Sequence, residues 1–435
     1  MPELRSLVFR EAAPEEGLGH KMEARARKLE IGGVAAEDLA ARYGSPLYVY
    51  DEDVIRARAR ALRDAFPARR FDIRYAAKAN TNLAVMRALR EEGMLADATS
   101  PGEVLAGLKA GWGPDQILFT GTSVTDEEMR WVVGKGVMVN ADSLGQLERY
   151  GRIAPGTRVS VRINPDVGAG HHDHVITGGP HSKFGIYFDR LEEARTIAAR
   201  HKLRIVGLHQ HIGSGVLDAD VFCEAIDVLL KAALDMPGLE FVDFGGGIGV
   251  PYRPDEKPID IAALGRKAVE RLDAFARAYG SPVRGMIEPG RYLVAESGTL
   301  LVTVNTIKTT PAHTFACVDS GFNHLVRHAM YGSYHPIANA SRTEGPRKEY
   351  VVAGNLCESG DVFSSDREIV DISVGDVLAI GNAGAYGFAM SSNYNMRPRP
   401  AEVMVRGGEA RLVGERETYA QLLRETPGED GQGRG

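Results

Sequence analysis

Residues 117–143, ILFTGTSVTDEEMRWVVGKGVMVNADS, hold a short β-rich run, a longer helix-like run and a second β-rich run. The runs ILFTG (117–121) and VMVNADS (137–143) are rich in the apolar and β-branched residues that favour strands. Between them, DEEMRWVVGKG (126–136) has the apolar spacing of a helix. The stretch therefore predicts one strand–helix–strand unit.

The same alternation recurs along the chain. Helix-like runs such as NLAVMRALREEG (82–93) and DRLEEARTIAARHK (189–202) separate short β-rich runs. Eight strands that alternate with helices over about 250 residues are typical of a (β/α)8 barrel of TIM type. An open, doubly wound sheet is the alternative, since eight parallel strands could also lie flat. The expected strands begin at Ile73, Leu95, Ile117, Val137, Val159, Ile205, Phe241 and Arg284.

The alternation of strand and helix patterns ends after about Ser297. LLVTVNTIK, FACVDSG, KEYVVAGNL and AEVMVRGGEARLVGE are β-rich runs separated by turns, with little helix between them. This pattern is typical of a mostly antiparallel β domain. We therefore expect a barrel at residues 46–297 and a β-rich domain made of residues 1–45 and 298–435.

Composition and charge exclude several classes of protein. Hydrophobic residues make up 44% and charged residues 25% of the 435 residues, so the chain can bury a core and is not disordered as a whole. No apolar run approaches the ~18 residues of a membrane helix, and a net charge of −6 argues against general nucleic-acid binding. Three cysteines cannot form a disulfide framework, and the N-terminus lacks the apolar core of a secretory signal. A cytoplasmic protein is expected.

Polar residues cluster where the expected barrel strands end, which is where barrel enzymes hold their reacting groups. Lys78 ends the first strand among alanines, and desolvation there would lower the pKa of its amine and free it to form a Schiff base. An exposed lysine at a strand end is the alternative. Only 12 lysines occur against 40 arginines, so few amines compete for this role.

Glycines after the sixth and seventh strands suggest an anion site. Gly245, Gly246 and Gly247 would let backbone amides approach a phosphate, and Ser214 lies between two glycines. The run never completes the G-x-G-x-x-G spacing of a dinucleotide site, and plain turns remain an alternative. A bound phosphate would explain the glycines and the lysine together.

Several further side chains could act in the same site. Glu288 and Arg291 of EPGR could serve a pyridine nitrogen and an anion, or form a surface ion pair. One of His209 and His211 could stack on a flat ring, and the thiol of Cys357 lies among acids. The histidines at 171, 172, 174 and 181 match no metal-site spacing, so no metal is expected.

Ten motifs then match a known family in order across nearly the whole chain. They are YAAKAN (75–80), NADS (140–143), VRINP (161–165), TGG…SKFGI (177–186), HQHIGSG (209–215), FGGGIG (244–249), IEPGR (287–291), VDSGFNHLVRHAMYGSYH (318–335), CESGD (357–361) and GAYGFAMSSNYN (384–395). The chain resembles the fold-type III pyridoxal-phosphate-dependent decarboxylases, and their diaminopimelate decarboxylase family in particular. The resemblance implies a barrel followed by a β domain, as in the alanine racemase/ornithine decarboxylase-like fold.

The resemblance also implies roles for individual residues. Lys78 would bind pyridoxal 5′-phosphate covalently, His211 would stack on its ring and Glu288 would pair with its pyridine nitrogen. Cys357 would be the proton donor to the substrate carbon, which makes Lys78, His211 and Cys357 the implied catalytic residues. The other implied cofactor-binding residues are Ser214, Gly245, Gly246, Gly247, Pro289, Gly290, Arg291 and Tyr386, and the implied substrate-binding residues are Arg291, Arg327, Tyr331, Glu358 and Tyr386.

The implied activity is decarboxylation of meso-2,6-diaminopimelate to L-lysine and carbon dioxide, the last step of lysine biosynthesis. The resemblance further implies a homodimer in which the CESGD loop completes the partner's active site. Alternatives are a decarboxylase of ornithine, lysine, arginine or carboxynorspermidine on the same fold, or an inactive relative with a binding or regulatory role. The sequence departs from the family pattern at His324 and His328, where an aspartate and a proline are expected.

Overall fold

The computed structural model describes residues 28–166, 179 and 181–423, which form two compact units. The barrel unit contains the described residues of 52–296 together with 384–389. The β unit contains residues 28–51, 297–383 and 390–423. His171, His172 and His174 lie outside the described residues, as do residues 1–27 of the N-terminal segment expected in the β-rich domain.

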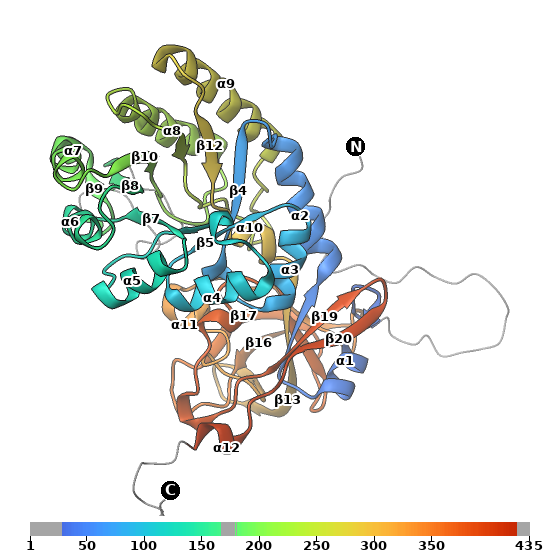
Figure 1. Ribbon diagram of the computed structural model, residues 1–435. Helices are drawn as coiled ribbons and strands as arrows, with labels where there is room; N and C mark the ends of the chain where they lie inside the picture. The colour runs from blue at the N-terminus through green and yellow to red at the C-terminus, as the bar shows by residue number, and fades with distance from the viewer. Residues whose placement is uncertain (1–27, 167–178, 180, 424–435) are drawn as a thin grey trace, which may run out of the picture. The chain divides into compact units, whose positions relative to one another are not determined.

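Eight parallel strands close the barrel (Figure 1). Each strand pairs with the next along the chain, β12 pairs with β4, and β8 pairs with β10, so the ring has no open edge. The closed-barrel prediction is confirmed, and the alternative of a flat, doubly wound sheet is wrong. The strands are β4 (Phe71–Ala76), β5 (Leu95–Ala98), β6 (Ile117–Phe119), β7 (Met138–Ala141), β8 (Arg158–Asn164), β10 (Arg204–His209), β11 (Phe241–Asp243) and β12 (Arg284–Ile287). A short strand, β9 (Ile186–Tyr187), pairs with β8 outside this ring.

Helices follow or precede the barrel strands (Figure 1). Hydroxyl and carboxylate side chains begin several of them: Ser100, Thr125, Ser143 and Asp260 each accept a hydrogen bond from a backbone N–H of the first turn. These are the local start signals that the strand–helix pattern requires. The helices are α2 (Glu52–Ala65), α3 (Leu83–Glu91), α4 (Pro101–Ala110), α5 (Asp126–Gly134), α6 (Leu144–Ile153), α7 (Leu191–Arg200), α8 (Ala219–Ala233) and α9 (Ile261–Tyr279).

The barrel interior separates apolar from polar residues along its axis. Val206, Phe241 and Met286 form a buried cluster with Met138 packed against it, which fills the interior below the carboxyl ends of the strands. Gly207 makes room for this packing, because a Cβ there would lie 2.1 Å from the ring of Phe241. The carboxyl ends carry polar side chains instead, as described below.

The β unit is built on a mostly antiparallel sheet. Its strands follow the order β17-β16-β14-β13-β3-β19-β20, with β15 and β18 attached through β13. The pairs β14–β16 and β3–β19 are parallel. The elements are β1 (Glu30–Ile31), β2 (Val34–Ala35), α1 (Ala36–Tyr43), β3 (Leu47–Asp51), β13 (Gly298–Thr309), β14 (Thr314–Val318), β15 (Ile337–Asn339), β16 (Arg347–Ala353), β17 (Val362–Val370), β18 (Val377–Ile380), β19 (Ala401–Arg406), β20 (Glu409–Gly414) and α12 (Tyr419–Leu422).

Strand β3 lies inside this sheet, between β13 and β19. The residues Leu47 to Tyr50 are fully buried, so the strand carries the same continuous apolar pattern as a barrel strand. The sequence boundary expected at residue 46 falls just before β3, whereas the barrel unit begins at Glu52. Helix α1 packs into the same core through Leu39, beside Leu301 of β13 and Val403 of β19.

No helix among the described residues is both long and apolar enough to cross a membrane.

Close packing of α9 on α2 gives a stability prediction. Gly265 of α9 faces α2, and a Cβ there would lie 2.3 Å from the backbone oxygen of Ala65. We expect Gly265→Ala to lower the free energy of unfolding by about 1–3 kcal/mol, because backbone cannot move aside cheaply. Gly134→Ala in α5 is the control: nothing lies within 4 Å of its Cβ, so it should raise stability by up to about 1 kcal/mol. Denaturant unfolding measures both, and equal effects would contradict the packing argument.

Candidate active site

A polar cavity of about 360 Å³ opens at the carboxyl ends of the barrel strands. This volume lies in the range of small-molecule sites. The cavity brings together Lys78, His211 and Glu288, which the sequence analysis selected from three different strand ends. Its other lining residues are Thr99, Thr120, Thr122, Arg162, Phe184 and His209.

Lys78 follows β4 in a single 3₁₀ turn (Ala77–Ala79) whose two alanines are buried. Its Nζ lies 3.6 Å from Oδ2 of Asp97, a residue with no exposed surface. Burial is the largest single effect and lowers the pKa of Lys78, but the charge of Asp97, together with smaller contributions from Tyr386 and Glu288, raises this pKa above its ordinary value. The expectation of a lowered lysine pKa is therefore wrong for the chain without cofactor, because the neighbouring carboxylate was not considered.

The pKa of Asp97 also departs from its ordinary value. Burial and the Glu288 charge raise its pKa to about 7, against the opposing effects of Lys78 and a hydrogen bond donated by Thr120 Oγ1. The ammonium–carboxylate pair between Lys78 and Asp97 is therefore fully formed only above about pH 7.

The glycine-rich loop after β11 holds the ring of His211. The backbone N–H of Gly246 donates to Nδ1 of His211 at 3.0 Å. A Cβ at Gly245, Gly246 or Gly247 would lie 2.1, 2.2 or 2.5 Å from a backbone oxygen, so glycine is needed for this close approach. Burial and the charges of Lys78 and Arg162 lower the pKa of His211 well below 6.5, which leaves a neutral, flat ring in the cavity.

Glu288 follows β12 and is 3% exposed. Its Oε2 lies 3.0 Å from Nε2 of His209, and its Oε1 is buried without a hydrogen-bond partner among the described residues. Burial would raise the pKa of Glu288, but His209 and Lys78 lower it to about 2. The site therefore presents a carboxylate with one unused oxygen. The Glu–Arg surface pair considered as an alternative is wrong, since Glu288 and Arg291 are both buried.

The residues after Glu288 pack against the lysine turn. The carbonyl of Pro289 accepts a hydrogen bond from the backbone N–H of Ala76 at 3.2 Å. A Cβ at Gly290 would lie 3.1 Å from Cβ of Ala79, so this position favours glycine. The EPG turn thus holds the Glu288 strand end against the Lys78 turn.

A second polar cluster surrounds Arg291, the first residue of α10 (Arg291–Val294). Its Nε and Nη2 donate to Ser214 Oγ at 3.1 and 2.9 Å, and its Nη1 donates to the hydroxyl of Tyr252 at 2.9 Å. The guanidinium also lies over the ring of Tyr386, 4.9 Å from its centroid. Tyr386 belongs to the barrel unit, where its N–H donates to the carbonyl of Ala79 at 2.8 Å.

The remaining sequence-predicted residues belong to the β unit, and their roles stay predictions. Arg327 and Tyr331 are the first and last residues of α11 (Arg327–Tyr331); Arg327 is buried and donates to Ser333 Oγ at 3.2 Å. Cys357 and Glu358 are exposed on a loop that buried Asp361 shapes by accepting hydrogen bonds from backbone N–H groups.

The histidines that depart from the family pattern make local contacts within the β unit. His324 is buried between Ser320 Oγ, 2.9 Å from its Nδ1, and the carbonyl of Pro398, 3.1 Å from its Nε2. Burial lowers its pKa to about 4, so it holds these loops as a neutral ring. Nδ1 of His328 lies 3.1 Å from the carbonyl of Ser333.

Sequence reasoning gave no role to several buried polar residues that support the cavity. Asn140, Arg162 and Asp243 end or nearly end apolar strands, and each is at most 6% exposed. Arg162 lies 3.5 Å from Asp142 and over the ring of Phe184. A polar residue within an apolar strand near its carboxyl end was the available signal, because such positions point toward the catalytic face of a barrel.

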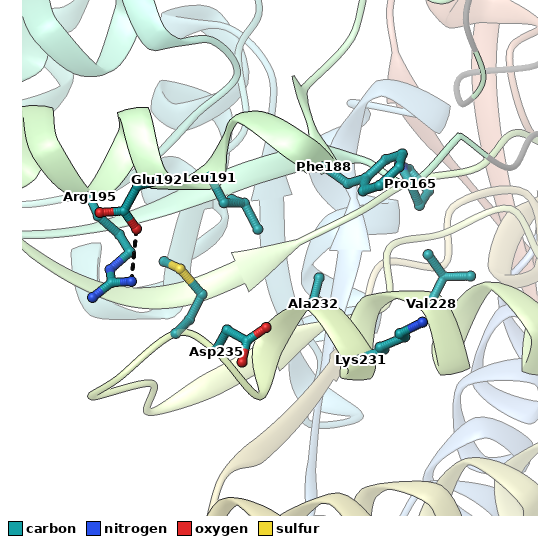
Figure 2. Close-up of a pocket in the computed structure, with 10 residues that line it drawn as sticks. Pro165, Phe188, Leu191, Glu192, Arg195, Val228, Lys231, Ala232 and Asp235 are labelled. Atoms are coloured by element: carbon teal, nitrogen blue, oxygen red, sulfur yellow. Dashed lines mark hydrogen bonds and ion pairs between the residues drawn. The ribbon is translucent and has the colours of Figure 1, made fainter.

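A second cavity, of about 430 Å³, lies on the outside of the barrel between α7 and α8 (Figure 2). Phe188, Leu191 and Val228 provide apolar surface, and an ion pair of 2.9 Å joins Glu192 and Arg195 at its edge. All its charged lining residues are exposed. The cavity at the strand ends, with its buried and perturbed groups, is therefore the candidate active site.

The site fits pyridoxal 5′-phosphate, which has an aldehyde, a pyridine nitrogen and a phosphate. Lys78 offers the amine, and the unpartnered oxygen of Glu288 offers an acceptor for a protonated ring nitrogen. The glycine loop leaves no room for side chains, and Ser214 with Arg291 provides donors for an anion.

The Asp97 contact predicts how cofactor uptake depends on pH. Asp97 raises the pKa of Lys78, so Asp97→Asn should lower it and make the reactive, neutral amine available at lower pH. We expect the rate at which cofactor-free protein reacts with pyridoxal phosphate to rise at a pH at least about one unit lower in the variant. Thr120→Ser keeps the hydroxyl that donates to Asp97 and should keep the wild-type profile. Identical profiles for Asp97→Asn and wild type would rule out the proposed effect.

Comparisons with known proteins agree with this geometry. Residues 52–295 match the family model described as pyridoxal-dependent decarboxylase, pyridoxal binding domain. A diaminopimelate decarboxylase of Methanothermobacter thermautotrophicus is 51% identical over 91% of this chain and 95% of its own, and that of Escherichia coli K12 is 39% identical over 88% and 94%. The crystal structure of the M. jannaschii diaminopimelate decarboxylase with L-lysine matches with a TM-score of 0.85 at 34% identity, over 91% of this chain and 95% of that one. With its closed barrel and its lysine–carboxylate cavity, the chain belongs to the pyridoxal-dependent decarboxylases and, within them, to the diaminopimelate decarboxylase family.

Proposed function

We propose that the protein decarboxylates meso-2,6-diaminopimelate to L-lysine and carbon dioxide, the last step of lysine biosynthesis. The observation that carries the proposal is the single cavity containing Lys78, His211 and Glu288, in a chain 51% identical to a diaminopimelate decarboxylase. The L-lysine in the related M. jannaschii structure agrees with lysine as product.

The cofactor, when bound, withdraws electrons from the substrate carbon that loses its carboxylate. Glu288 sustains this effect, because a carboxylate beside the pyridine nitrogen keeps that nitrogen protonated. Lys78 would hold the cofactor through its amine, and the neutral ring of His211 would provide a flat surface for stacking. A neutral ring suits this role because a cation would oppose the protonated nitrogen.

The phosphate would bind to Ser214, the loop of Gly245, Gly246 and Gly247, and Tyr386. The amides of Gly245 and Gly246 donate to Asp243 Oδ1 and His211 Nδ1, so these two glycines would serve by close approach and not as donors. Ser214 and Tyr386 both contact Arg291, whose planar fork can bind a phosphate or a substrate carboxylate. Pro289 and Gly290 support the cofactor through the EPG turn described above.

Residues of the β unit would recognise and protonate the substrate. Arg327 and Tyr331 would bind the distal carboxylate, and Glu358 the distal amine, which together favour a substrate with both groups at its far end. Cys357 would donate a proton to the carbon that has lost carbon dioxide. In this proposal Arg291 and Tyr386 also contact the substrate.

We further propose a homodimer whose two active sites are shared, with the CESGD loop of each subunit entering the partner's barrel. The exposure of Cys357 and Glu358 on a shaped loop supports this assignment. A cytoplasmic location belongs to the same proposal, since a proton-donating thiol must stay reduced.

Substrate preference is tested by carbon dioxide release from a panel of amino acids. We expect meso-diaminopimelate to be turned over fastest, ahead of ornithine, lysine, arginine and carboxynorspermidine. Lys78→Ala should abolish both turnover and the visible absorbance of the bound cofactor. Faster turnover of ornithine would refute the specificity, and wild-type protein that takes up no cofactor would refute the enzyme assignment.

The shared site is tested with two inactive variants. Cys357→Ala should lower kcat far more than it raises KM, because the thiol acts after substrate binds. When the Cys357→Ala and Lys78→Ala proteins are mixed and exchange subunits, half of the dimers contain one subunit of each. One of the two sites in such a dimer is intact, so the mixture should show about a quarter of wild-type activity. Without a gain on mixing, each site would have to be built from one subunit.

A further inference from the structure

Behind Glu288 lies a row of buried polar side chains from three barrel strands. Asn140 of β7 is fully buried, and its Nδ2 lies 3.1 Å from Nδ1 of His209 on β10. His209 is 1% exposed, and its Nε2 lies 3.0 Å from Oε2 of Glu288. The row therefore runs from Asn140 through the imidazole to the carboxylate that lines the cavity.

The chemistry of the amide decides where the imidazole carries its proton. The NH2 group of Asn140 can only donate, so Nδ1 of His209 must accept. The proton of the neutral ring then lies on Nε2 and is donated to Glu288. An N–H on Nδ1 of His209 would face the NH2 of Asn140, so this contact favours the tautomer with its proton on Nε2.

The hydrogen bond from Nε2 of His209 engages Oε2 of Glu288 and leaves Oε1 for the cofactor. A charged imidazolium would neutralise the carboxylate from behind and weaken its attraction for a protonated pyridine. For the second carboxyl beside this pair, Asp243, burial and the charge of Glu288 raise the pKa well above its ordinary value. A ring nitrogen of His209, a carboxylate oxygen of Asp243 and a carboxylate oxygen of Glu288 lie within 4.8 Å of one another. The position of the proton on His209 therefore affects both carboxyl groups.

Other charged groups face Glu288 from the cavity side. Lys78 and His211 act on it directly, and Asp97 and Arg162 belong to the same group of interacting charges. Lys78, Arg162 and His211 line the cofactor cavity, as His209 does, whereas Asn140 is not among the lining residues and makes its contact through Nδ1 of His209. The direction of the Asn140–His209 hydrogen bond therefore affects the charge at Glu288 separately from the charged groups in the cavity.

We propose that Asn140 and His209 are positioning residues that hold Glu288 as a carboxylate with one oxygen reserved for the ring nitrogen of pyridoxal phosphate, Asn140 by fixing the tautomer of His209. This inference rests on the proposed function. It extends that function to two residues that act through Glu288.

The experiment replaces the donor in the Asn140–His209 hydrogen bond with an acceptor and changes the shape of the side chain little. In Asn140→Asp the new carboxylate can only accept, which draws a proton onto Nδ1 and makes His209 an imidazolium. Asn140→Ala removes the donor without reversing it. Asn305→Asp is the matched control, because it makes the same chemical change at an exposed position of β13.

Each protein is loaded with pyridoxal 5′-phosphate labelled with 15N at the ring nitrogen, and the chemical shift of this nitrogen is measured by NMR. In Asn140→Asp we expect the resonance to move toward that of unprotonated pyridine, and kcat on meso-diaminopimelate to fall about 10- to 100-fold, the range for loss of a partner that orients an active-site ligand. KM should change less than about threefold, because substrate contacts are retained. Asn140→Ala should show smaller changes in the same direction, and Asn305→Asp none.

The outcomes separate this inference from the proposed function. The inference would be overturned if the wild-type protein is active and both Asn140→Asp and Asn140→Ala keep the wild-type 15N shift and kcat. The proposed function would then remain intact. A lowered Tm with an unchanged 15N shift would assign Asn140 a structural role only, which also overturns it. Wild-type protein without cofactor uptake or decarboxylation would overturn the proposed function, and the inference with it.

Discussion

The hydrogen bonds that close the parallel sheet, between β8 and β10 and between β12 and β4, are the constraint on which the active site depends. In a closed parallel barrel all carboxyl ends meet at one rim, so residues up to 210 positions apart in the chain become neighbours. Lys78 and Glu288 share a cavity for this reason. An open sheet with the same strands would spread these residues along an edge.

Closure also imposes a cost, because the groups at the rim are buried or half-buried. Asp97 and Glu288 are buried, Lys78 and His211 are half-buried, and the pKa values of all four depart from the ordinary ones. The rim offsets this cost by pairing charges and by keeping some groups neutral. Glu288 is paired with His209 through one oxygen, and its second oxygen is buried without a hydrogen-bond partner among the described residues.

Backbone geometry contributes as much to the cavity as side chains do. The three glycines after β11 lie so close to neighbouring carbonyls that no Cβ fits, and their loop fixes the ring of His211 through the N–H of Gly246. The segment around Tyr386 comes from late in the chain, yet it bonds to Ala79 beside the lysine turn. The site is therefore assembled from loops whose positions are set by main-chain contacts.

The sequence by itself determined the eight strands, the alternating helices, the β-rich remainder and the residues at the strand ends, because periodicity and local composition report these features directly. Lys78, Glu288 and the pair His209 and His211 were placed at strand ends in this way, and the family resemblance singled out His211. The sequence did not determine that β3 pairs inside the second sheet, since Leu47 to Tyr50 form a fully apolar run that suits either unit. Nor could it determine the sign of the Lys78 pKa shift or the tautomer of His209. Both depend on partners from other strands, Asp97 and Asn140, and only the closed barrel decides which buried groups lie within reach of one another.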